Sequence, residues 1–226
     1  MRIGLLQTGD APEELHYTLG NYNDMFVRLL TGEPHDFEFS LYRILDHEFP
    51  DNIDECDGWL ITGSRFSAYD TQAWIPALRT LIQQIVASKK PLIGICFGHQ
   101  IIAEALGGKV EKSEKGWGLG LDTYQIDTEL LADSDTQLTL NIFHQDQITR
   151  LPPGAKVYAR SDFCEYAGMF IGKQVMTMQA HPEFEIEYNR QLLQIRKSMV
   201  IPENLADQAI AVLSDENTHT DSDRFG

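Results

Sequence analysis

The sequence is poor in cysteine, in positive charge and in long apolar runs. Only 3 of its 226 residues are cysteines, too few for a disulfide scaffold and leaving one thiol over in any pairing. Asp and Glu number 34 against 18 Lys and Arg, and the net charge of −16 argues against a protein that binds nucleic acid. No run approaches the roughly 18 apolar residues of a membrane span, and the N-terminus lacks the apolar stretch of a secretory signal. We therefore expect a cytoplasmic protein with neither nucleic-acid nor membrane partners.

Common cofactor-binding patterns are missing as well. No Gly-x-x-x-x-Gly-Lys-Ser/Thr is present, and Gly107–Val110 is interpreted as a helix end and a turn. The glycines within 116–120 lack the strand–turn–helix setting of a dinucleotide loop. The cysteines and histidines do not have the spacing of a zinc site. Cys56, in an acidic run, and Cys164, in a strand pattern, are expected to be structural. We expect no cofactor and no metal.

Apolar periodicity divides the chain into two halves. In the first half, short buried runs alternate with helical patterns, which predicts strands over 3–7, 37–44, 58–62 and 92–95 and helices over 13–31, 74–88 and 98–106. Such alternation is typical of an α/β fold: a doubly wound, mostly parallel sheet with helices on both faces. The second half is β-rich, with predicted strands over 121–126, 138–143, 155–160, 166–171 and 174–179 before helices over 184–199 and 203–213. We expect a single domain over residues 1–213 and a polar, acidic tail over 214–226 that frays.

One cysteine lies in a setting typical of a nucleophile. Cys96 is flanked by Gly94 and Gly98, where an apolar strand ends and a helix begins. This is the thiol counterpart of a hydrolase nucleophile elbow, whose strained turn leaves no room for neighbouring Cβ atoms. The positive field of a helix N-terminus favours the thiolate, which is the nucleophilic form. The amide of Phe97 would supply half of an oxyanion hole.

A base with an orienting acid follows near the C-terminus. His181 and Glu183 lie two residues apart after an alternating, strand-like segment, and Pro182 stiffens the pair. At the end of a strand such a carboxylate can orient the imidazole, which completes the logic of a Cys–His–acid triad. A surface His–Glu pair is the alternative that this motif leaves open by itself.

Together these motifs resemble the class I glutamine amidotransferases, which carry Gly-x-Cys-x-Gly-x-Gln at the nucleophile and His-Pro-Glu near the C-terminus. Both are present here, over 94–100 and 181–183. The segment Thr62–Arg65 resembles the family's oxyanion segment, although Ser64 replaces its second glycine and makes the turn less free to flip. Phe143–Asp146 resembles a Ser-His-Gly-Asp segment of GMP synthase glutaminase domains. The resemblance covers about residues 1–195 and implies a flavodoxin-like fold.

The resemblance also implies a reaction. Cys96 would attack the side-chain amide of glutamine, or of another γ-glutamyl small molecule, and form a γ-glutamyl thioester. His181, oriented by Glu183, would act first as the base and then as the acid toward the leaving amine.

The remaining site residues are implied in the same way. The amides of Phe97 and of the Gly63–Ser64 turn would hold the oxyanion, and Gln100 and His144 would contact the glutamyl group. Arg65 is a separate hypothesis from its position: directly after the oxyanion turn, it could recognise an anionic group on the leaving side of the substrate. A surface arginine that pairs with a local carboxylate is the alternative that stays open.

Three functions remain open at this stage. The first is a stand-alone γ-glutamyl hydrolase, similar to the γ-glutamyl peptidases. The second is a glutaminase subunit that delivers ammonia to a separate synthetase. The third is a non-catalytic binding module of the same fold, which the intact triad argues against. Because no ATP-using domain follows in the sequence, we do not expect a complete synthetase.

Overall fold

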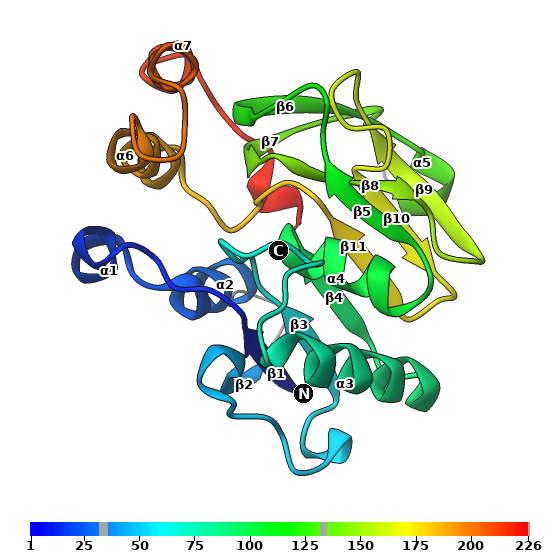
Figure 1. Ribbon diagram of the computed structural model, residues 1–226. Coiled ribbons are helices and arrows are strands. Elements are labelled where there is room, and N and C mark those ends of the chain that lie inside the picture. The colour runs from blue at the N-terminus through cyan, green and yellow to red at the C-terminus, as the bar shows by residue number, and fades with distance from the viewer. Residues whose placement is uncertain (32–35, 132–134, 226) are drawn as a thin grey trace.

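The computed structural model describes residues 1–31, 36–131 and 135–225 (Figure 1). In chain order the strands and helices are β1 (Arg2–Gln7), α1 (Glu13–Leu19), α2 (Tyr22–Leu30), β2 (Glu38–Arg43), β3 (Gly58–Ile61), α3 (Trp74–Ser88), β4 (Leu92–Ile95), α4 (Phe97–Ala105), β5 (Lys109–Lys112), β6 (Gly118–Ile126), α5 (Thr128–Leu131), β7 (Gln137–His144), β8 (Asp146–Arg150), β9 (Ala155–Arg160), β10 (Gly168–Ile171), β11 (Val175–Met178), α6 (Ile186–Arg196) and α7 (Glu203–Leu213).

A nine-stranded sheet with the order β2-β1-β3-β4-β11-β10-β9-β6-β7 forms the centre of the molecule. The first five strands in this order are parallel, and the pairs from β11–β10 to β6–β7 are antiparallel. A small separate sheet pairs β5 with β8. The parallel half has the strand order of a flavodoxin-like sheet. The predicted α/β fold with a β-rich second half is therefore confirmed.

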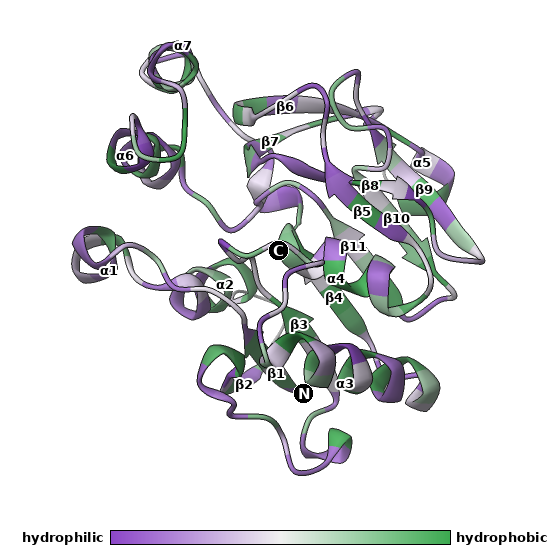
Figure 2. Cartoon of the chain, viewed as in Figure 1, coloured by the Kyte–Doolittle hydropathy of each residue, from purple (hydrophilic) through white to green (hydrophobic). Residues whose placement is uncertain are grey.

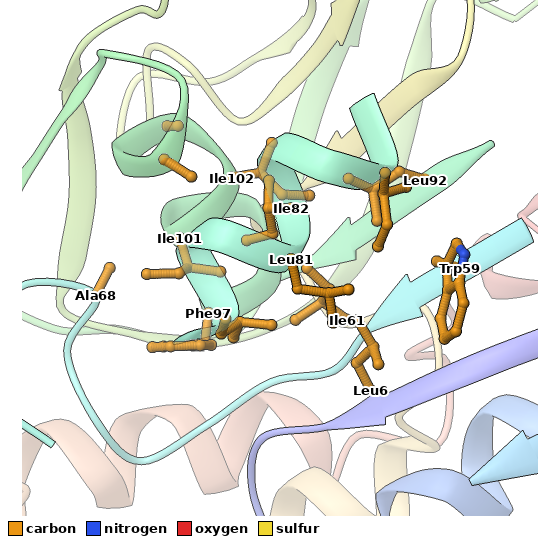
Figure 3. Close-up of a cluster of buried hydrophobic side chains, with 14 of the residues drawn as sticks. Leu6, Trp59, Ile61, Ala68, Leu81, Ile82, Leu92, Phe97, Ile101 and Ile102 are labelled. Carbon is orange, nitrogen blue, oxygen red and sulfur yellow. The ribbon is translucent and has the colours of Figure 1, made fainter. Parts of the chain in front are cut away.

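Both faces of the parallel half are covered by apolar side chains. Leu6 and Ile61 pack in the cluster that α3 and α4 cover, whereas their neighbours Leu5 and Leu60 pack in a second cluster with Phe26 of α2. This alternation follows from the two-residue period of a strand. Figure 2 shows hydrophobic residues along β3 and β4, with mixed polarity along α3. Figure 3 shows the first cluster, in which residues of α3 and α4 meet those of the sheet. Helices therefore cover both faces, as predicted.

Two predicted elements differ in the structure. The helix expected over 13–31 is two helices, because Gly20 leaves the helical conformation with φ +89° and Asn21 caps α2 in a capping box with Asp24. The turn expected at 107–110 instead leads into β5, whose Val110 pairs with Ile148 of β8. Each of these two short strands buries little apolar surface, so neither has a periodic signal in the sequence.

The tail up to Phe225 packs against the sheet, whereas we expected the tail to fray. The backbone N–H of Asp221 donates to Thr139 O (2.8 Å), and its carboxylate accepts from Thr139 N–H (2.7 Å). Arg224 donates to Gln137 O (2.8 Å), and Phe225 packs in the second apolar cluster. These contacts satisfy backbone groups on the outer side of β7, the last strand of the sheet.

We expect Ile82→Ala to lower the free energy of unfolding by about 2–5 kcal/mol, because Ile82 is fully buried between α3 and the sheet. Val212→Ala is the control, since Val212 is 52% exposed and its truncation should cost less than about 0.5 kcal/mol. Urea denaturation followed by circular dichroism measures both. Equal effects of the two substitutions would contradict this description of the core.

Candidate active site

The turn between β4 and α4 holds Cys96 in a strained conformation. Its φ is +52°, which is rare for a residue with a side chain. The turn is possible because a Cβ on Gly98 would collide with Ile61 O, and one on Gly94 would lie 2.6 Å from Gly98 O. The two glycines thus let α4 lie directly against β3 and β4, with the thiol at the N-terminus of the helix.

His181 is held from three sides. Its Nδ1 is 2.7 Å from Glu183 Oε1, and both side chains are buried. The ring of Phe184 stacks on the imidazole with 4.0 Å between centroids and 10° between planes. The backbone N–H of His181 donates to Asn141 O (2.8 Å), and the Asn141 amide donates to Phe184 O (2.8 Å). The imidazole therefore has one orientation.

The surroundings of His181 favour its protonated form. Burial lowers the pKa of His181, but the charges of Glu183 and Cys96 and their hydrogen bonds raise it more, to about 10. The imidazole and the thiol both lie beside Gly63, since a Cβ placed on Gly63 would be 3.1 Å from His181 Cε1 and 3.8 Å from Cys96 Cβ. The arrangement is that of an imidazolium next to a thiol, with the acid behind it.

A second group of polar side chains surrounds the backbone carbonyl of Asp146. This oxygen accepts from Gln100 Nε2 (3.0 Å) and from His144 Nδ1 (3.1 Å). A carbonyl can only accept, so Nδ1 of His144 carries the hydrogen. Burial lowers the pKa of His144 to about 4, which leaves the ring neutral. His144 Nε2 is then a buried acceptor, and it has no partner in the described part of the chain. Gln100 also donates to Gln179 Oε1 (3.0 Å), so its own Oε1 stays available as an acceptor.

The carboxylate of Asp146 accepts two hydrogen bonds from the loop that follows the oxyanion segment. Ser67 Oγ donates to Asp146 Oδ2 (2.5 Å), and Tyr69 OH donates to Oδ1 (3.0 Å). Residues 67–69 and 146 are therefore fixed to each other, although they are far apart in the sequence. The sequence pointed to Asp146 through the family resemblance, but gave no sign of these two partners.

These groups open into one cavity of about 470 Å³, within the range of about 300–1,000 Å³ that is usual for small-molecule sites. The predicted site residues in its wall are Ser64, Arg65, Cys96, Gln100, His144 and His181. Glu183, Gly63 and Phe97 lie behind this wall, and the Phe97 ring packs on Trp74 in the core. Two further cations, Lys112 and Arg196, line the cavity and were not predicted.

The other two cysteines are buried away from the cavity. Burial raises the pKa of Cys164 to about 12 and also raises the pKa of Cys56. Both thiols are therefore unreactive, as expected for structural residues.

No group of three or more His, Cys, Asp or Glu side chains in the described ranges could hold a metal ion. Within the same ranges, no helix is both long and apolar enough to cross a bilayer.

Both the sequence and the structure of this chain match those of known proteins. The family model described as Glutamine amidotransferase class-I matches residues 35–196. Gamma-glutamyl peptidase 3 of Arabidopsis thaliana is 34% identical over 216 residues, which covers 91% of this chain and 84% of the relative. The glutamine-hydrolyzing GMP synthase of Dehalococcoides mccartyi is 38% identical over 130 residues, which covers 56% of this chain and 23% of the synthase. A crystal structure of a glutamine amidotransferase from Thermotoga maritima matches with a TM-score of 0.72 over 94% of this chain and 93% of its own, at 18% identity, and so shares the fold.

We expect Glu183→Gln to lower the pKa of His181 by about 1–3 pH units, because the carboxylate that favours the imidazolium is then neutral. Glu187→Gln is the control, since it removes an exposed charge from the same region, where Glu187 pairs with Arg190. An NMR titration of the His181 ring measures the pKa in each variant. An unchanged pKa in Glu183→Gln would show that this carboxylate does not govern the imidazole.

Proposed function

Because the chain belongs to the class I glutamine amidotransferase family, we propose that it is a thiol hydrolase that cleaves γ-glutamyl amide bonds and releases glutamate. The observation that carries this proposal is the arrangement of Cys96 at the N-terminus of α4, beside a His181 that Glu183 orients, in the wall of a cavity. A non-catalytic module would not need the strained φ of Cys96.

The reaction follows from these positions. The Cys96 thiolate attacks the carbon of the γ-amide, and the negative charge moves to the amide oxygen. The imidazolium of His181 gives its proton to the nitrogen as the C–N bond breaks, so the amine leaves and a γ-glutamyl thioester remains. Water then attacks the thioester and His181 accepts its proton. Glutamate is released and the thiolate is restored.

Two acceptors in the cavity wall support recognition of the glutamyl group. His144 Nε2 is a neutral, unpartnered acceptor among the described residues, and Gln100 Oε1 lies on the same wall. Both would accept hydrogen bonds from the α-ammonium of a γ-glutamyl substrate, which is a donor-only group. A buried acceptor without a partner is costly, so substrate binding satisfies it.

The cations of the cavity support a peptide as the substrate. For Arg65, Lys112 and Arg196, no carboxylate lies within ion-pair distance in the ranges that the structure describes, in a protein with a net charge of −16. Such cations suit the carboxylate of an amino acid or peptide that leaves with the γ-nitrogen. Ammonia, the leaving group of glutamine, has no anionic group that these cations could bind.

A glutaminase subunit that delivers ammonia to a separate synthetase is the second candidate, supported by the similarity to part of a GMP synthase. The γ-glutamyl peptidase name of the Arabidopsis relative, which aligns along most of both chains, favours the hydrolase. The three cysteines are free, buried thiols, which supports a location in the reducing cytoplasm.

We expect the purified protein, with no partner, to release glutamate from γ-glutamyl peptides, and Cys96→Ala to lower this rate by at least about 10⁴-fold. Cys164→Ala, which removes a buried thiol outside the cavity, should keep the rate. Glutamate release from glutamine and from a panel of γ-glutamyl peptides measures this. If no substrate is hydrolysed while iodoacetamide still alkylates Cys96 rapidly, the protein is a glutaminase that needs its synthetase.

We expect Arg65→Ala to reduce kcat/KM for γ-glutamyl peptides roughly tenfold more than for glutamine, because it removes a charged hydrogen-bond donor from the leaving side. Arg2→Ala is the matched control, since Arg2 begins β1 at the opposite end of the sheet from Cys96. Equal losses with both substrates would refute a leaving-side role for Arg65.

A further inference from the structure

We propose that Thr8 and Thr62 are positioning residues that lock the Gly63–Ser64 peptide with its N–H toward the reacting carbonyl, so that the oxyanion hole is preformed without a partner. This inference rests on the proposed thioester chemistry of Cys96. It concerns two residues that touch neither substrate nor the catalytic pair, and it decides whether the protein works alone.

The two threonines follow neighbouring strands, and both hydroxyls lie within hydrogen-bond distance of the carbonyl of Gly63. Thr8 follows β1, Thr62 follows β3, and both side chains are fully buried. Thr62 Oγ1 accepts from the backbone N–H of Thr8 (3.0 Å), which leaves its own proton for Gly63 O (3.1 Å). Thr8 Oγ1 lies 3.2 Å from the same oxygen and 2.9 Å from Thr62 O. The carbonyl of Gly63 is thus fixed toward β1.

A glycine makes space for that carbonyl. A Cβ on Gly9 would lie 2.7 Å from Gly63 O and 3.0 Å from Ser64 Cα, so only glycine fits there. Because a trans peptide points its N–H opposite to its C=O, the N–H of Ser64 points away from the threonines. In the described part of the chain this N–H has no hydrogen-bond acceptor of its own. The catalytic Cys96 and His181 lie beside Gly63, so a reacting carbonyl held there can take this donor.

Phe97 supplies the second donor. It is the first residue of α4, so its N–H has no acceptor within the helix. In this proposal the N–H groups of Ser64 and Phe97, one from each segment, form the oxyanion hole.

The side chain of Ser64 opposes the alternative orientation. Ser64 is not among the residues with positive φ in the structure. Flipping the Gly63–Ser64 peptide would reverse the sign of φ at Ser64, into a region that glycine enters freely and serine rarely. The family's second glycine would permit that flip, whereas Ser64 and the two hydroxyls resist it.

The test compares two reagents that modify the same thiol. The diazomethyl ketone analogue of glutamine has a carbonyl that becomes an oxyanion when Cys96 attacks, whereas iodoacetamide reacts by displacement and forms none. In Thr8→Val/Thr62→Val we expect the rate of inactivation by the ketone to fall about 10- to 100-fold, in the range for loss of an oxyanion donor, with iodoacetamide unaffected. On γ-glutamyl peptides kcat should fall while KM stays constant. Thr62→Ser, which keeps the hydroxyl, should behave as wild type.

Two outcomes would refute the positioning role of the threonines. One is an unchanged rate of inactivation by the ketone; the other is an equal loss of rate with both reagents in a variant whose Tm shows it to be folded. If the double variant does not fold, the single Val variants decide in the same assay, each with an expected loss of roughly two- to tenfold from one hydrogen bond.

The assay also separates this inference from the proposed function. Wild type that reacts quickly with the ketone but hydrolyses no γ-glutamyl peptide would refute the hydrolase and leave the lock supported. Val variants that turn over peptides at the wild-type kcat would refute the lock and leave the hydrolase intact.

Discussion

Parallel pairing of β1, β3, β4 and β11 is the constraint on which the site depends. The ladders run in register, with Leu6 opposite Ile61, Ile61 opposite Gly94 and Gly94 opposite Thr177. Parallel strands end at one edge of the sheet, so the residues after each strand meet there. Four segments that are distant in sequence thereby bring together Thr8, the Gly63–Ser64 turn, Cys96 and His181. A slip of one residue in any ladder would turn its side chains to the opposite face and separate these groups.

Burial lowers the pKa of both histidines in the cavity wall, whereas a neighbouring negative charge raises it. The balance of these two effects sets the protonation state of each ring. For His144, burial and the charge of His181 lower the pKa more than the hydrogen bond to the Asp146 carbonyl raises it, so the ring stays neutral. His181 is as deeply buried, but Glu183 and Cys96 lie against it and raise its pKa, so the imidazolium form is favoured. Two imidazoles in one wall therefore have different protonation states at the same pH. One can accept a hydrogen bond from a cationic substrate group while the other donates a proton.

The sequence predicts those site residues whose proposed chemistry allows only a few residue types. A nucleophile on a strained turn needs glycines beside it, and Cys96 shows them; an orienting acid close in sequence to its base shows in Glu183. The parallel half of the sheet followed from short apolar runs that alternate with helical patterns. Thr8 and Thr62 could not be found in this way, because they are 54 residues apart and meet only through the register of β1 and β3. The same holds for Asp146, which binds Ser67 and Tyr69 across 79 and 77 residues. A residue with a hydroxyl group is common at the end of a strand, and only the three-dimensional fold shows which group it binds.

The outer side of β7 is occupied along its length by unrelated parts of the chain. Arg224 and Asp221 of the C-terminal segment bind at Gln137 and Thr139, and His181 binds at Asn141. An uncovered strand at the end of a sheet is a template for pairing with another molecule. Asp221 and Arg224 therefore occupy backbone groups of β7 that an added strand would need. His181 binds the same strand two residues further on, at Asn141, so a strand added along this edge would compete with the turn that carries the imidazole.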